Sequence, residues 1–146
     1  MPYSYVIVED LGLIYYLITG YVTGKELLSL EVVAINVPAR RPNMKIITDI
    51  QLASVDVDMD SIKALLSKNR ELDKSGWQLE ATAFITHNHL LVSLASAYEL
   101  MGIDLPLRLK ICQTIDEAVE WLELNEVKDR ILLIRQQLLD KTTHTP

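Results

Sequence analysis

The sequence predicts an α/β fold in which helices cover a mostly parallel central sheet. Two observations support this class: apolar strand-like segments alternate with amphipathic helix-like segments, and two strand-like segments open the chain with no helix between them. Strands separated by helices need crossover connections and therefore run parallel, whereas an opening hairpin adds an antiparallel edge. The predicted order of elements is β-β-α-β-α-β-α-β-α.

Segments rich in β-branched and aromatic residues are predicted to form the strands. In chain order they cover residues 3–8, 13–19, 44–52, 78–86 and 107–112. The turn Glu9-Asp10-Leu11-Gly12 joins the first two segments into the hairpin. We interpret residues 37–43 as a solvated loop and residues 54–58 as the connection into the helix that follows.

Each predicted helix begins at a capping residue. The first has a complete capping box, in which the Thr23 hydroxyl accepts from the amide of Glu26 and the Glu26 carboxylate reaches back to the amide of Thr23. This helix should begin at Gly24 and end before Pro38, because proline supplies no amide and disfavours helix before it. The caps expected for the later helices are Asp58 or Asp60, Asn88 and Thr114.

Length and charge limit the class of protein. At 146 residues the chain has the size of one domain, so we expect a single domain over residues 1–146, with residues 123–141 as a helical C-terminal extension. A formal net charge of -6 repels a polyanion, and the Arg40-Arg41-Lys45 cluster is too small for a nucleic-acid footprint. Nucleic acid is therefore not an expected partner.

Cysteine usage and the N-terminal region indicate the compartment. Cys112 is the only cysteine, which rules out an intramolecular disulfide and favours a reducing environment. The N-terminus lacks the basic and apolar regions of a signal peptide, and its longest apolar run, residues 11–22, is shorter than the ~20 residues that span a bilayer. We expect a cytoplasmic protein without a membrane span.

Short motifs along the chain resemble those of a known family. They are Gly20-Tyr21-Val22-Thr23, Ile46-Ile47-Thr48-Asp49, Phe84-Ile85-Thr86, Ala95-Ser96-Ala97-Tyr98-Glu99-Leu100 and Ile115-Asp116-Glu117-Ala118-Val119-Glu120-Trp121-Leu122. With the order of elements given above, the chain over residues 3–122 resembles the SpoIIAA-like family, which belongs to the STAS group of folds. The resemblance implies an STAS-like sheet and a regulatory rather than a catalytic role.

The chain departs from this family at one functional motif. Classical anti-sigma-factor antagonists of the STAS group carry Asp-Ser-Ser-Gly-Leu, whose second serine is phosphorylated by the partner kinase. The matching stretch here resembles Asp60-Ser61-Ile62-Lys63-Ala64-Leu65, and the helical periodicity of Ile62 predicts a core position. The kinase switch is therefore not expected, unless Ser61 replaces the family serine with a side chain that faces solvent.

The tripeptide His87-Asn88-His89 is the best-placed candidate binding site. It follows a predicted strand, where open parallel sheets bind ligands, and it precedes a helix N-terminus, which favours anions. A His-x-His pair supplies too few ligands for zinc, and Asn88 as an ordinary helix cap explains the tripeptide without a ligand. Binding and capping both remain open, and we expect neither a metal nor a cofactor.

Asp49 is a second candidate, because a carboxylate among Ile46, Ile47 and Ile50 needs a buried partner. That partner is either a structural hydrogen bond or a ligand. The sequence contains no phosphate-binding or nucleophile-elbow motif, and Cys112 lies in the middle of a predicted strand. We therefore predict no catalytic residue.

An apolar stripe marks the C-terminal helix. Its residues recur at spacings of three and four and are Leu124, Val127, Ile131, Ile134 and Leu138. Because residues 115–122 are already expected to cover the sheet, we interpret the stripe as a homodimer interface. The alternative is that this helix itself covers the sheet.

These observations favour a non-enzymatic STAS-like regulatory or protein-interaction module, cytoplasmic and dimeric. The first alternative is a small carrier of an apolar or lipid-like ligand, which requires a closed pocket lined by Tyr15, Tyr16 or Phe84. The second alternative is an enzyme, which requires His87 or His89 to lie within hydrogen-bond reach of a carboxylate such as Asp49.

Overall fold

The protein contains a five-stranded sheet in the order β1-β2-β3-β4-β5. A computed structural model describes residues 3–26, 44–76, 81–103, 105 and 108–143. β1 and β2 pair antiparallel, and every other neighbouring pair is parallel. The predicted α/β fold with its antiparallel opening hairpin is therefore confirmed. The strands are β1 (Tyr3–Val8), β2 (Leu13–Thr23), β3 (Lys45–Asp56), β4 (Ala81–Ile85) and β5 (Arg108–Cys112).

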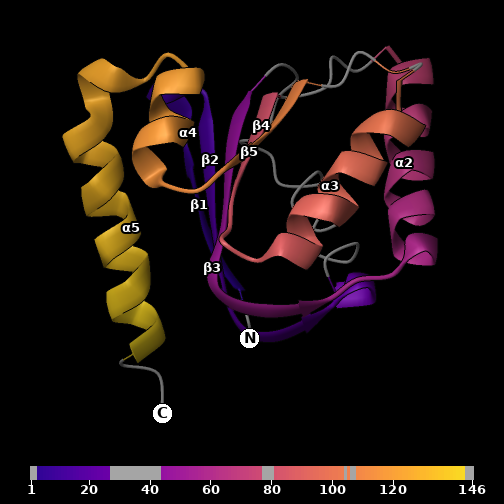
Figure 1. The fold of residues 1–146 in the computed structure, drawn as a ribbon. Coiled ribbons are helices and arrows are strands. Elements are labelled where there is room, and N and C mark those ends of the chain that lie inside the picture. Colours follow the sequence, from indigo (N-terminus) through magenta and orange to yellow (C-terminus); the bar gives the residue numbers. More distant parts are fainter. Residues whose placement is uncertain (1–2, 27–43, 77–80, 104, 106–107, 144–146) are drawn as a thin grey trace.

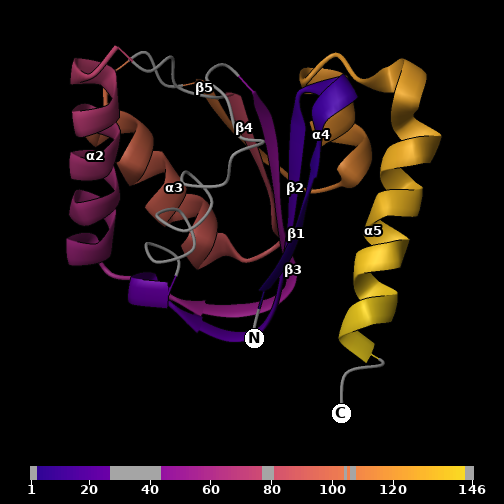
Figure 2. The same cartoon turned by 180° about the vertical axis from the view of Figure 1, so that it is seen from behind.

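Helices cover both faces of this sheet. In Figures 1 and 2, α2 and α3 lie on one face, and α4 and α5 lie on the other. We call these the α2/α3 face and the α4/α5 face. The helices are α2 (Met59–Lys74), α3 (His89–Met101), α4 (Ile115–Trp121) and α5 (Lys128–Thr143). Of the predicted helix that begins at Gly24, only the first turn lies within the described residues.

The predicted capping contacts are present at three helix starts. The Thr23 amide lies 3.2 Å from Glu26 Oε1, and the Glu26 amide lies 3.2 Å from Thr23 Oγ1, which completes the capping box. Asp58 caps α2 by accepting from the Ser61 amide, and Thr114 Oγ1 accepts from the amide three residues on in α4. These caps explain why both helices begin where the sequence predicts them.

β2 and β3 extend further than predicted. The pairs Tyr21 with Ser54 and Thr23 with Asp56 continue the ladder, so residues 54–56 belong to a strand and not to a connection. Between Leu17 and Thr19 the register shifts, because β3 contains one extra residue there. The two strands therefore form a long ribbon that bends toward α2 (Figure 1). β4 ends one residue earlier than predicted, before Thr86. The predicted start of this strand, at residues 78–80, lies outside the described residues.

Two cores lie on opposite faces of the sheet. Because successive strand residues alternate between faces, Tyr15 belongs to the core under α4 and α5, and Tyr16 belongs to the core on the other face. Lys45 supports the first core at its edge, where its Nζ lies 2.5 Å from the Leu122 carbonyl oxygen at the end of α4. The Lys45 ammonium group therefore lies at the C-terminal end of α4, where the helix dipole favours a positive charge.

The apolar stripe of the C-terminal helix is not exposed. Leu124, Ile131, Ile134 and Leu138 are 7%, 0%, 9% and 4% exposed, and Val127 packs against the same core. α4 has only seven residues and contacts β4 and β5, so it leaves β1 and β2 for α5 to cover. The expectation that α4 alone covers the sheet is therefore wrong. The stripe packs within its own chain, and the interpretation of the stripe as an exposed dimer interface is wrong as well.

Candidate functional site

A buried carboxylate lies at the centre of the α4/α5 face. Asp49 is directly beside Leu17 of β2 and Ile85 of β4, and it is 0% exposed. It shares this face with Ile47, because residues two apart in a strand point to the same side. Such a burial is costly unless hydrogen-bond partners and a counter-charge compensate it.

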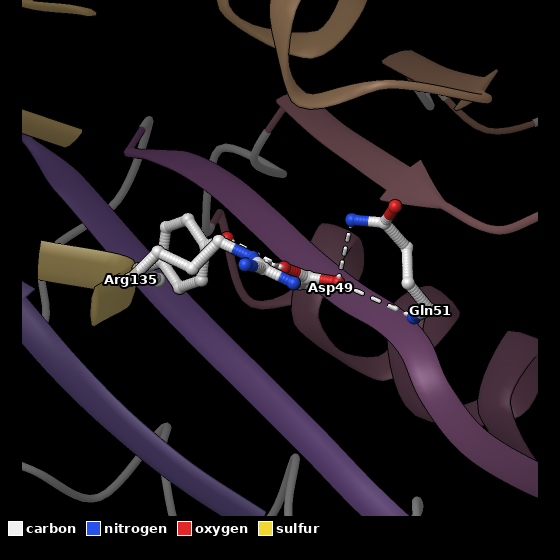
Figure 3. Close-up of polar contacts among 4 residues, drawn as sticks. Asp49, Gln51 and Arg135 are labelled. Carbon is white, nitrogen blue, oxygen red and sulfur yellow. Dashed lines mark hydrogen bonds and ion pairs between the residues drawn. The ribbon is translucent and has the colours of Figure 1, made fainter. Parts of the chain in front are cut away.

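Four groups donate hydrogen bonds to the Asp49 carboxylate (Figure 3). Oδ2 accepts from Tyr15 Oη at 2.7 Å and from Arg135 Nε at 2.7 Å. Oδ1 accepts from the backbone amide of Gln51 at 3.3 Å and from its side-chain Nε2 at 3.2 Å. We call Tyr15, Asp49, Gln51 and Arg135 the Asp49 cluster. It joins β2, β3 and α5, and it lies where β3 carries its extra residue.

The electrostatics of this cluster favour a fixed charge pair over proton transfer. Burial raises the pKa of the Tyr15 hydroxyl well above its ordinary value, and the neighbouring charge of Asp49 raises it further. Burial lowers the pKa of the Arg135 guanidinium, but the hydrogen bond and the charge of Asp49 outweigh it, so the net shift is upward. Tyr15 therefore stays a neutral donor and Arg135 stays a cation near neutral pH.

The histidine turn lies where the sequence predicts it, at the carboxyl end of β4. His87, Asn88 and His89 are exposed, and the Asn88 carbonyl oxygen accepts from the Val92 amide at 3.0 Å in the first turn of α3. Thr86 is buried and holds the turn, because its Oγ1 accepts from the Asn88 amide at 3.1 Å. Asn88 thus occupies the expected cap position.

The structure does not bring the histidines and Asp49 together. Every described hydrogen bond of Asp49 goes to another member of its cluster, and none joins it to His87 or His89. Within the same described residues there is also no group of three or more His, Cys, Asp and Glu side chains that could hold a metal ion. Among the described residues, the convergence of His87 or His89 with Asp49 that the enzyme alternative requires is therefore not present.

Ser61 lies in the first turn of α2 and is half-buried. Its Oγ donates to Asp58 Oδ1 at 2.9 Å, and a Cβ placed on Gly24 would lie only 2.1 Å from this Oγ atom. Ile62, which stands at the place of the family serine, is 3% exposed. The core position predicted for Ile62 is confirmed, and the Ser61 hydroxyl packs against the start of the first helix.

Two members of the Asp49 cluster are not predicted from the sequence. Arg135 directly follows the buried Ile134, and Gln51 lies two residues after Asp49. The available signal was the carboxylate itself, because an aspartate among isoleucines needs a buried partner. Only the docking of α5 shows that this partner includes the cation of Arg135.

Cys112 has no reactive environment. It is buried at the end of β5, and burial raises the pKa of its thiol to about 11.

The described helices were also compared with the requirements of a membrane span. None of them combines the length and the apolar character needed to cross a membrane.

The arrangement of elements defines the class: this is an α/β protein with a SpoIIAA-like fold. A solved structure with this fold is an uncharacterized protein from the DUF3478 family from Shewanella loihica PV-4. The two chains are 14% identical, the alignment covers 82% of this chain and 93% of that one, and the TM-score is 0.54. No family model matches this chain, and no curated protein matches it either. The likeness therefore establishes the fold alone.

Proposed function

We propose that this protein is a non-enzymatic regulatory or interaction module that binds a protein partner at the carboxyl edge of its sheet. The observation that supports this function is the saturation of Asp49. Its two carboxylate oxygens are fully engaged by Tyr15, Gln51 and Arg135, which are groups of the same chain. A carboxylate in this state holds the fold together and is not poised to act on a substrate.

The proposed contact surface consists of exposed polar residues that follow β4 and β5. The Thr86 amide donates to the Cys112 carbonyl oxygen at 3.0 Å, which places the two strand ends side by side. The residues of this carboxyl-edge surface are His87, Asn88, His89 and Gln113, and all four are exposed. Polar groups on loops that a rigid sheet supports are well suited to recognise a partner.

The proposal includes no kinase switch of the family type. A buried Ile62 offers no hydroxyl, and a phosphate on Ser61 would meet the backbone at Gly24 and the carboxylate of Asp58. The cytoplasmic location expected from the single Cys112 remains part of the proposal. Of the aromatic residues named for the carrier alternative, Tyr15 is buried in one core and Tyr16 in the other, and Phe84 packs against the core of Tyr16.

Affinity capture with matched variants tests this function. The double variant His87→Ala/His89→Ala should lose the captured partner while keeping the wild-type melting temperature, because both side chains are exposed. Asn125→Ala/Glu126→Ala, which changes exposed residues beyond the opposite end of α4, is the control and should retain it. Equal loss of partner from both variants, or a small molecule retained in native mass spectrometry, would contradict the proposal.

A further inference from the structure

The docking of α5 on the sheet uses matched charges on three separate elements. Lys128 pairs with Asp116 of α4 at 2.7 Å. Arg130 pairs with Asp10 in the turn between β1 and β2, with N–O distances of 2.5 and 2.9 Å. Arg135 pairs with Asp49 of β3. The buried residues Ile131 and Ile134 lie between Arg130 and Arg135, and the buried Leu138 follows Arg135. The sheet therefore accepts a helix with one particular order of cations and apolar residues.

The buried pair of Arg135 and Asp49 restricts which helix can dock on this face of the sheet. An apolar helix without a cation at the place of Arg135 would leave the Asp49 carboxylate buried and uncompensated, which is strongly unfavourable. A helix with the order Ile-x-x-Ile-Arg-x-x-Leu satisfies the surface, and residues 131–138 of any copy of this chain have that order. The occupant that fits besides the chain's own α5 is thus the α5 of a second copy.

The connection between α4 and α5 contains a strained residue. Glu123 has φ 60, in the left-handed region that favours glycine, and it is the one non-glycine residue of the described chain with positive φ. The Leu124 amide donates to the Val119 carbonyl oxygen and the Glu123 amide to the Glu120 carbonyl oxygen, which is the turn at a helix end where glycine usually stands. The closed turn therefore stores backbone strain that an extended connection releases.

We propose that α5 is an exchangeable helix: two copies of this chain dimerise by opening the connection at Glu123 and docking each α5 on the sheet of the other copy. In the dimer, Arg135 of one protomer completes the Asp49 cluster of its partner. Residues 123–127, when extended, span roughly 16 Å at ~3.3 Å per residue. Opening this connection withdraws the buried Leu124 from its core, so the exchanged dimer has to bury Leu124 again. This inference goes beyond the proposed function and concerns a different part of the sheet.

Cross-linking between isotopically distinct chains tests the exchange. Asp10→Cys in unlabelled full-length protein and Arg130→Cys in nitrogen-15-labelled protein are mixed, unfolded, refolded together and treated with a short bismaleimide. Both positions are exposed, and the native Cys112 is buried. Only an exchanged dimer places the two new cysteines side by side. The control mixture pairs Arg130→Cys with Glu71→Cys, an exposed position on α2.

We expect the mixed-isotope product to exceed the control several-fold. Glu123→Pro, which cannot adopt a positive φ, should increase it, and Glu123→Gly, which relieves the strain of the closed turn, should decrease it. Circular dichroism verifies that each variant is folded. If the proline variant does not fold, the comparison of the glycine variant with the wild type still tests the exchange. A product at the control level, or one that does not respond to residue 123, would overturn the exchange and leave the carboxyl-edge surface unaffected.

Discussion

Arg135 Nε and Asp49 Oδ2 lie 2.7 Å apart, although the two residues are separated by 86 positions in the chain. This contact joins the C-terminal helix to a central strand and gives a fully buried carboxylate its cation. Buried pairs of this kind often add little net stability, but breaking one is costly because a charge is left behind. The pair therefore governs where α5 docks more than how much free energy the docking releases.

Arg135→Met should lower the free energy of unfolding by about 3 kcal/mol, the lower end of the range for breaking a buried ion pair, because part of the Arg135 side chain is exposed. Urea denaturation measures this difference. The matched control, Arg130→Met, removes an exposed pair on the same helix and should have a much smaller effect. Adding Asp49→Asn to Arg135→Met should restore part of the loss. Equal effects of the two single variants would contradict the role assigned to Asp49.

Alkaline pH should destabilise the protein through Tyr15. Burial raises the pKa of this hydroxyl above its ordinary value of 10.0, so in strong base the unfolded chain loses a proton that the folded chain retains. The stabilising contribution is therefore fully present below about pH 10 and declines as the pH rises further. In Tyr15→Phe, stability should depend less steeply on pH above this value, as measured by chemical denaturation in a pH series. An unchanged slope would show that Tyr15 ionises freely in the folded state.

Acid should weaken the cap of α2. The hydrogen bond from the Ser61 amide to the Asp58 carboxylate, followed by that from the Ser61 hydroxyl, lowers the pKa of Asp58 below its ordinary value of 3.8. Because the folded pKa is the lower one, the stabilisation is present above the unfolded value and is lost as the pH falls through the folded pKa. A carbon-13 NMR titration of the Asp58 carboxyl should show this downward shift. Ser61→Ala keeps the backbone donor, so it should reverse only the part of this pKa shift that the Ser61 hydroxyl causes.

Gly24→Ala should destabilise the protein by about 1–3 kcal/mol, the usual range for overpacking, because the new methyl group meets the Ser61 side chain. Ser61→Gly removes both atoms that the methyl group would meet. The double variant should therefore lose less stability than the sum of the two single variants, in a thermal or chemical denaturation cycle. Additive losses would show that Gly24 and Ser61 do not press against each other.

The sequence by itself determined the order of elements and the places where helices begin. Thr23, Asp58 and Thr114 act on amides within three residues of themselves, so their capping role is local and readable. Strand content follows from runs of apolar residues in the same way, and the family-like motifs lie on these same local elements. For this reason the fold class is predictable from the sequence.

Tertiary structure alone decided the partners of Asp49 and the surface against which the C-terminal stripe packs. An apolar stripe of period 3.6 is the same whether it packs on its own sheet or on another chain, so Ile131 and Leu138 carry no record of which surface buries them. The sequence likewise predicts that Asp49 needs a buried partner, but it does not single out one of its 14 lysines and arginines. The choice of Arg135 follows from the length of α4, which leaves part of the sheet uncovered, and from the register in which α5 fills that space.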